Sequence, residues 1–318
     1  MGINKIKIIL VFNLNSMNCF RSFIYLIGVF LLVQCNKSAG AEEVHYDTTQ
    51  QQQKADTVQK DTVVKKEIKY HAFVVKNKNK DFNALEKKYS QEELHAILAI
   101  NRLDYKNKWR ADTLVVPDVL EKDFTVYSPF PKNVSAARNI QKLAMFSYAI
   151  HAYALYENGN LIKWGPTSMG KKATPTKMGL TFTNWKKEIA ISTVNSDWKL
   201  RWNFNLYNYL GIGWHQYDLP GHHASHSCVR LLEEDAYFMY NWADEWILNK
   251  KGTVALAKGT PVIIFGPPVF NKKPWLQLIK SPHANDYTEA EINHEIQPFL
   301  PEILKQQNIK RQYLEHAP

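Results

Sequence analysis

Two strand-like runs meet at Asn158-Gly159, and this pair limits what the middle of the chain can fold into. The runs read AYALYE and NLIKWGP, and an Asn-Gly pair between such runs is typical of a type I′ β-hairpin. Further strand-like runs read KEIAISTV, LRWNFNLY, GIGWHQY and TPVIIFG. The pattern therefore predicts a mostly β domain over residues 125–268.

One helix stands out within this domain and begins near Leu232. Small and apolar residues recur at helical spacing, and acidic residues occupy the first turn, where negative charge complements the helix dipole. The spaced residues are Ala236, Met239, Tyr240, Ala243 and Ile247, and the acidic ones are Glu233, Glu234 and Asp235.

The first 69 residues differ in composition from the rest of the chain. An apolar run at 22–33, SFIYLIGVFLLV, follows Arg21 and is short for a membrane-spanning helix, as in a secretory signal. The run ends near Cys35 and resembles a bacterial lipoprotein signal, so we expect residues 1–35 to direct export and Cys35 to be lipidated. An uncleaved anchor is the alternative, and Met17 is an alternative start. Residues 36–69 are polar and predict a disordered tether.

The charge of the chain bears on its partners. The net charge is +10, but Lys and Arg are scattered, so the sequence does not favour nucleic-acid binding. A basic exported protein is attracted to anionic lipids and cell-wall carboxylates. We therefore expect an envelope protein held at the membrane by a lipid anchor.

Residues 70–117 read as a small βααβ unit. A strand at 73–75 precedes two helical stretches, in which Leu94, Ile97 and Leu98 have i, i+3, i+4 spacing, and DTLVVP closes the unit. The segments LEKKYS, EELHAILAINRLD and DTLVVP resemble the lysin motif (LysM), which binds peptidoglycan glycan. NKNKDFNAL departs from the Gly-Asp-Thr-Leu turn of that motif. Glycan contact through residues 70–117 and a unit that only spaces or docks the next domain both stay open.

A histidine-rich stretch, GHHASHSCVRLLEEDA at 221–236, contains Cys228. Cys19 and Cys35 fall in the predicted signal, which leaves Cys228 as the thiol of the mature chain. A metal site, a solvated turn and a thiol nucleophile are three interpretations. His222, His223, His226 and Cys228 are types of residue that bind zinc, but a second Cys or His pair is missing from the sequence nearby, so we expect no metal.

The nucleophile interpretation needs a base near the thiol. His215 ends a predicted strand upstream of Cys228, and an imidazole there would take the thiol proton. Backbone N–H groups near Ser227 and Cys228 would face an oxyanion.

The stretch HQYDLPGHHASHSCVRL resembles the active-site signature of the L,D-transpeptidase catalytic domain. That signature has an upstream His, a Pro-Gly loop and Ser-His-Gly-Cys-(Ile/Val)-Arg, matched here by His215, Pro220-Gly221 and residues 225–230. GTPVIIF resembles the closing strand of that family. An upstream element also matches, at Ser168, Gly170, Thr174, Pro175, Thr176 and Gly179.

Two positions depart from the family pattern. Ser227 replaces the glycine beside the nucleophile, and serine costs energy there if the position needs a positive φ. Gln216 follows the upstream His, where the family often has glycine.

The resemblance implies a β-sandwich or barrel-like fold, with the helix after the cysteine, and assigns roles to residues. Cys228 would be the nucleophile and His215 the general base and acid. His226, Ser225 and Ser227 would support the turn and the oxyanion, and Arg230 would hold a substrate carboxylate or fix the loop. His222 and His223 would be exposed loop residues, with either as an alternative base. Trp198 and Trp202 would line the groove or pack in the core.

The implied chemistry is acyl transfer on peptidoglycan, without a cofactor. Cys228 would attack the diaminopimelate–D-Ala carbonyl of a tetrapeptide stem and pass the acyl group to an amine acceptor. A wall-binding protein that has lost activity, an L,D-carboxypeptidase and another cysteine hydrolase are the alternatives. Residues 269–318 predict an amphipathic helical extension in which Thr288 caps a helix with Glu291.

Overall fold

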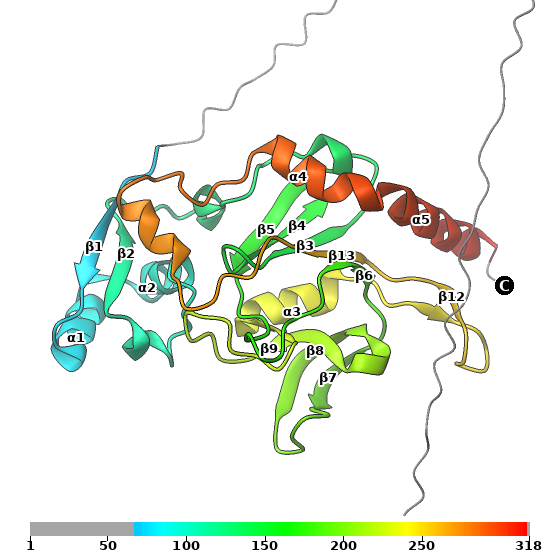
Figure 1. Cartoon of the computed structure of the whole chain (residues 1–318), viewed down its shortest axis with the longest axis horizontal. Helices are drawn as coiled ribbons and strands as arrows, with labels where there is room; N and C mark the ends of the chain where they lie inside the picture. The colour runs from blue at the N-terminus through cyan, green and yellow to red at the C-terminus, as the bar shows by residue number, and fades with distance from the viewer. Residues whose placement is uncertain (1–66, 317–318) are drawn as a thin grey trace, which may run out of the picture. The chain divides into compact units, whose positions relative to one another are not determined.

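The computed structural model of the protein describes residues 67–316 (Figure 1). The predicted signal, Cys35 and nearly all of the predicted tether lie outside the described residues. Across residues 67–316, no helix is both long and apolar enough to cross a membrane.

Residues 70–117, called the N-terminal unit here, contain the predicted strands and helices in the predicted order. Strand β1 (Tyr70–Val74) pairs antiparallel with β2 (Thr113–Pro117), and helices α1 (Lys78–Lys88) and α2 (Gln91–Ile100) lie between them in sequence. Ser90 and Glu93 form a capping box that starts α2. The unit has its own apolar core, built around Phe82, Leu85, Leu94, Ile97, Leu98 and Leu114.

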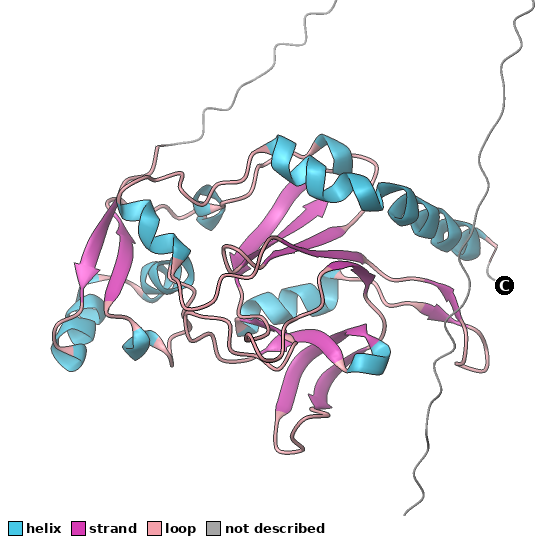
Figure 2. Cartoon of the chain, viewed as in Figure 1, coloured by secondary structure: helices cyan, strands magenta, loops and turns pink. Residues whose placement is uncertain are grey.

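A five-stranded sheet forms the centre of the main domain, in the order β5-β4-β3-β13-β6 (Figure 2). The predicted hairpin consists of β4 (Ala152–Glu157) and β5 (Asn160–Pro166), and Asn158 and Gly159 both have positive φ, as a type I′ turn requires. Strand β13 (Pro261–Phe265) runs parallel to β3 (Leu143–Ser147) and antiparallel to β6 (Gly179–Phe182).

A second sheet of four strands has the order β10-β9-β8-β7. Its strands are β7 (Lys186–Ile191), β8 (Lys199–Tyr207), β9 (Ile212–Gln216) and β10 (Val229–Leu231). The first three correspond to predicted strands. Strand β10 pairs parallel with β9, a pairing that connects two segments separated by a long loop.

Helix α3 (Glu233–Trp242) and the four-stranded sheet pack against one face of the five-stranded sheet. Apolar side chains from both sheets and the helix form one buried cluster, which includes Phe146, Tyr153, Phe204, Trp214, Val229 and Met239. The prediction of a mostly β domain with a helix after the cysteine is confirmed.

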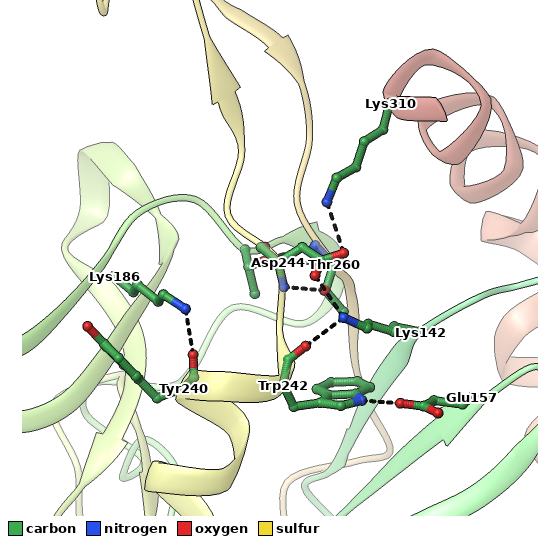
Figure 3. A network of polar contacts seen from close by, with 9 residues as sticks. Lys142, Glu157, Lys186, Tyr240, Trp242, Asp244, Thr260 and Lys310 are labelled. Carbon is green, nitrogen blue, oxygen red and sulfur yellow. Dashed lines mark hydrogen bonds and ion pairs between the residues drawn. The ribbon is translucent and has the colours of Figure 1, made fainter. Parts of the chain in front are cut away.

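The helix is shorter than the spacing of apolar residues predicted, because Ile247 lies in strand β11 (Ile247–Leu248), which pairs with β12 (Ala255–Ala257). Polar contacts hold the chain just after the helix. Asp244 accepts hydrogen bonds from the Nζ atoms of Lys142 and Lys310, at 2.8 and 2.9 Å (Figure 3). Its backbone carbonyl accepts from Thr260, which draws this segment out of the helix.

The C-terminal segment covers the other face of the five-stranded sheet. A 3-10 helix η5 (Pro274–Ile279) precedes α4 (Glu289–Ile296) and α5 (Leu300–Glu315), and Thr288 and Glu291 form the predicted capping box. Trp275, Ile292, Ile296 and Ile303 are buried in the same cluster as Met145 and Trp164 of the sheet. The segment is therefore part of the core of the main domain.

Candidate active site

Cys228 and His215 line one pocket because β9 and β10 are parallel neighbours. His215 lies on β9 opposite Arg230 of β10, and Cys228 directly precedes β10. This register places Cys228 beside Gly213, two residues before His215, and side chains two residues apart along a strand point to the same face of the sheet. The two side chains and Arg230 line a pocket of about 90 Å³, called the catalytic pocket here.

His215 is buried and oriented by its backbone neighbour. Its Nδ1 lies 2.9 Å from the carbonyl oxygen of Gln216, so Nδ1 carries the proton and Nε2 has a free lone pair. Burial lowers the pKa of His215 to about 4, with that hydrogen bond opposing the decrease and the charge of Arg230 adding to it. The imidazole is therefore neutral near pH 7 and able to accept a proton.

The Cys228 thiol is also uncharged in the resting site. Burial raises its pKa, while a backbone hydrogen bond from Gly213 and the charge of Arg230 oppose the increase. The Sγ atom lies 3.7 Å from the Gly211 carbonyl oxygen. A neutral thiol and a neutral imidazole that line one pocket suit proton transfer during attack, as in general-base catalysis.

The turn before Cys228 has the backbone that a glycine would normally provide. Ser227 has φ of +82°, in the region that disfavours side chains. Its Oγ donates to the Thr174 carbonyl at 3.2 Å, and Ser225 Oγ donates to the carbonyl of Cys228. These two bonds hold a strained turn in place.

The upstream Ser-x-Gly and Thr-Pro-Thr residues contact this turn and support it. Ser168 pairs with Arg230 and Gly170 with Ser225 in isolated β-bridges. A Cβ at Gly170 would lie 2.2 Å from the Thr174 carbonyl oxygen, so the close approach requires glycine. The Thr174 Oγ1 donates to the Ser225 carbonyl at 3.1 Å.

His226 borders the catalytic pocket and contacts a residue that sequence reasoning missed. The Nζ of Lys171 lies 3.2 Å from His226 Nε2, and the His226 ring lies 5.3 Å from the ring of Trp198. Desolvation lowers the pKa of His226, as do the charges of Lys171 and Arg230. The position of Lys171, directly after the Ser-x-Gly element, is the sequence signal that would have identified it.

The expectation for the two histidines at the start of the loop is only half right. His222 is exposed, but His223 is buried, so its prediction as an exposed loop residue is wrong. Its ring stacks on His151 with centroids 3.6 Å apart, Nδ1 accepts from Met169 N–H, and Nε2 donates to the Tyr148 carbonyl. With both nitrogens engaged, His223 is a structural residue rather than a base.

Arg230 holds the loop before Cys228 and also borders the pocket. Its guanidinium lies over the Tyr217 ring at 4.5 Å and 3.4 Å from the Asp218 carbonyl, which fixes the loop. It also lines the catalytic pocket. Trp198 lines the pocket too, whereas Trp202 packs edge-to-face against Tyr237 of α3, with ring centroids 4.7 Å apart.

The N-terminal unit contacts the loop that links His215 to Cys228. Asp104 accepts a hydrogen bond from Leu219 N–H at 2.6 Å and donates its own N–H to the Leu219 carbonyl. Leu103 forms a β-bridge with Pro220, and Gly221 N–H donates to the Arg102 carbonyl at 3.1 Å. The unit is docked against the main domain through the loop beside the site.

The Arg102 side chain strengthens this contact from inside the protein. It is buried, donates to the Ile150 carbonyl at 3.0 Å, and lies over the rings of Trp164 and Trp275.

Among residues 67–316, no three His, Cys, Asp or Glu side chains are grouped to hold a metal ion.

Comparison with protein families gives a match to the main domain. Residues 141–264 match the family model named YkuD, the L,D-transpeptidase catalytic domain. These residues form an L,D-transpeptidase catalytic domain. A comparison with curated proteins gave no match.

Solved structures similar to this L,D-transpeptidase domain cover 40% of the chain. One is an L,D-transpeptidase from Stackebrandtia nassauensis, 22% identical over 57% of its chain with a TM-score of 0.33. Another is from Mycobacterium smegmatis, 18% identical over 59% with a TM-score of 0.31. A third, L,D-transpeptidase 3 from Mycobacterium tuberculosis with a faropenem-derived adduct, is 21% identical over 61% with a TM-score of 0.32. The chain thus spans about three fifths of each.

Proposed function

We propose that the protein is a peptidoglycan L,D-transpeptidase with Cys228 as nucleophile and His215 as general base. The observation that carries the proposal is the joint position of these two residues in one pocket, at the ends of paired strands, within a domain that matches this family. The substrate would be a tetrapeptide stem of peptidoglycan.

The first half-reaction forms a thioester. As Cys228 Sγ attacks the diaminopimelate carbonyl, the thiol proton passes to His215 Nε2, and the proton is then given to the departing D-Ala amine as the C–N bond breaks. Backbone N–H groups around Ser227 and Cys228 support the oxyanion. His226 positions this turn, and Arg230 faces the pocket as a partner for a substrate carboxylate.

The second half-reaction regenerates the thiol. An acceptor amine attacks the thioester carbonyl, its proton passes to His215, and the C–S bond breaks as the proton returns to sulfur. An amine of another diaminopimelate gives a 3→3 cross-link, a free D-amino acid gives exchange, and a protein lysine gives anchoring. Water as the acceptor would give carboxypeptidase activity instead.

The location proposed for the enzyme is the cell envelope. The apolar run at 22–33 and Cys35 support export with a lipid anchor, and the N-terminal unit supports contact with wall glycan. Mass analysis of the mature protein from a membrane fraction tests the anchor, because an unmodified Cys35 would contradict it.

The test of the proposed reaction is product analysis with disaccharide-tetrapeptide muropeptides as substrates. We expect release of D-Ala together with a 3→3 linked dimer, and neither product from a Cys228→Ala variant. Tripeptide without dimer would identify a carboxypeptidase, and an unchanged substrate with folded protein would identify a binding protein.

A further inference from the structure

Among residues 67–316, His215 and His226 are the histidines that line the catalytic pocket, and their rings are held in opposite ways. The Gln216 carbonyl engages Nδ1 of His215 and leaves Nε2 to accept a proton. In His226 it is Nε2 that is engaged, because the Nζ atom of Lys171 lies 3.2 Å away. A lysine ammonium has donors but no acceptor, so His226 Nε2 accepts this bond and the proton of the neutral ring is on Nδ1.

The Lys171 contact is the one hydrogen bond of the His226 ring within residues 67–316. Nδ1 of the ring is buried and has no partner there. The other close contact of the ring is with Trp198, whose ring centroid is 5.3 Å away and which does not fix the position of a proton. The orientation and the tautomer of His226 therefore depend on Lys171.

Lys171 is itself fixed on the turn that it supports. Its backbone N–H donates to the Ser225 carbonyl at 3.1 Å, and its carbonyl accepts from Thr174 N–H at 2.9 Å. The backbone and the side chain of Lys171 thus contact two consecutive residues, Ser225 and His226, in the turn that leads to Cys228.

The charges near His226 keep its ring neutral. Desolvation lowers the pKa of His226, and the charges of Lys171 and of Arg230 in β10 lower it further. Trp198 is uncharged, and no Asp or Glu is among the described residues that line the pocket. A neutral ring whose Nε2 is engaged has no lone pair to offer the Cys228 thiol.

We propose that Lys171 is a positioning residue of the reaction, which holds His226 neutral with its proton on Nδ1 and fixes the turn that presents Cys228. The thiol proton then passes to His215, whose Nε2 has an available lone pair. Lys171 does not line the catalytic pocket, so it acts through His226 rather than on the substrate. The inference rests on the proposed function, in which this turn supports the oxyanion.

Nuclear magnetic resonance of protein labelled with ¹⁵N-histidine measures the ring directly, and the His226 signals are those lost in His226→Gln. We expect a protonated Nδ1 in the unaltered protein. Lys171→Met should raise the pKa of His226, because a nearby positive charge is removed, and should abolish the preference for Nδ1. Lys171→Arg retains the charge and the donor, so it should preserve both properties. Lys172→Met, at the adjacent exposed lysine, is the matched control and should leave the ring unchanged.

Release of D-Ala from a tetrapeptide muropeptide separates positioning from substrate binding. Lys171→Met should lower kcat about tenfold and keep KM within about twofold, because the contact that is lost lies outside the pocket lining. Lys171→Arg should recover most of kcat, and Lys172→Met should retain it. If Lys171→Met does not fold by circular dichroism, Lys171→Gln replaces it. Its amide keeps an N–H donor without the charge, so it should raise the pKa of His226.

The outcomes distinguish this inference from the proposed function. A His226 ring with the same tautomer and pKa after loss of the Lys171 charge, or a kcat equal to that of Lys172→Met, would overturn the role of Lys171. Unaltered protein that releases no D-Ala would contradict the proposed function, whereas the resonance measurement would still decide whether Lys171 controls His226.

Discussion

At the residue scale, the site depends on two neutral groups, His215 and Cys228, whose pKa values burial has shifted in opposite directions. Burial lowers the pKa of His215 to about 4 and raises the pKa of Cys228. A preformed thiolate–imidazolium pair would need the reverse order of these two pKa values. The thiol is therefore activated when substrate is attacked rather than before.

This order predicts how the thiol responds to pH. We expect the rate of Cys228 alkylation by iodoacetamide to keep rising above pH 8.5, about the ordinary thiol pKa, because reaction requires the thiolate. A plateau reached near pH 6 would indicate a preformed ion pair and would contradict the account. His215→Ala is the control, since its alkylation profile should lie close to that of the unaltered protein.

Replacement of Ser227 by glycine should make the protein more stable. Its φ of +82° disfavours a side chain, so Ser227→Gly should increase the free energy of unfolding by about 0.5–1 kcal/mol. Ser227→Ala keeps the strain and removes the bond to Thr174, so it separates the two effects in urea unfolding. A Ser227→Gly variant less stable than Ser227→Ala would mean that the turn is not strained.

Because buried histidines have lowered pKa values, the protein should lose stability in acid. Burial lowers the pKa of His223 to about 4, whereas the unfolded chain has a histidine pKa of about 6.5. Between these values the unfolded state binds more protons, so stability present above pH 6.5 falls as the pH falls toward 4. From pH 7 to pH 5 the loss is on the order of 2 kcal/mol for one such histidine. Urea unfolding of His223→Gln should show a smaller difference between these two pH values than the unaltered protein.

At the scale of elements, short-range patterns are the part of the fold that could be predicted. The turn at Asn158-Gly159 and the capping box at Thr288 depend on adjacent residues, and both were recognised in the sequence. The parallel pairing of β10 with β9 and the burial of His223 against His151 depend on residues far apart in the chain. Periodicity contains no information on such contacts. It also predicted that the helix after Cys228 reaches Ile247, whereas α3 ends at Trp242 and Ile247 lies in β11.

The same limit applies to the site. The motif drew attention to Cys228, His215, Ser168 and Gly170, because these residues have a recognisable spacing, but it did not predict that Ser168 and Gly170 contact the turn before Cys228. The contact of Asp104 with Leu219 joins two segments whose sequences give no sign of each other.

That contact predicts that the N-terminal unit supports the active site. Asp104→Ala removes the acceptor for Leu219 N–H, which should cost about 1–3 kcal/mol of unfolding free energy and lower kcat by loosening the loop before Cys228. Asp112→Asn is the control in the same unit, because the Asp112 pair with Lys78 is exposed and its loss should cost under about 0.5 kcal/mol. Equal kcat in both variants would show that the unit does not act on the loop.

At the scale of the whole molecule, segments that look separate in the sequence contribute to one apolar core. The C-terminal helices contribute Ile292, Ile296 and Ile303 to the face of the central sheet that α3 does not cover. Figure 1 shows α4 beside the strands of the central sheet, whereas α5 continues past them. Through α4 and the start of α5, where Ile303 is buried, the segment therefore stabilises the domain.

A cavity in this shared core should destabilise the whole domain. Ile296→Ala, at a fully buried position, should cost about 2–5 kcal/mol, whereas Leu314→Ala, at a 60% exposed position on α5, should cost under about 0.5 kcal/mol. Thermal unfolding followed by circular dichroism measures both. A small effect of Ile296→Ala would mean that the C-terminal helices do not share the core.

The central claim is that Cys228 forms a thioester with a peptidoglycan stem. The most direct measurement is the intact mass of residues 67–318 after brief incubation with a tetrapeptide stem, beside a Cys228→Ala variant. The account predicts an adduct equal to the stem minus D-Ala, on the unaltered protein alone. An adduct that persists without Cys228, or folded protein that gains no mass while the stem stays intact, would contradict it.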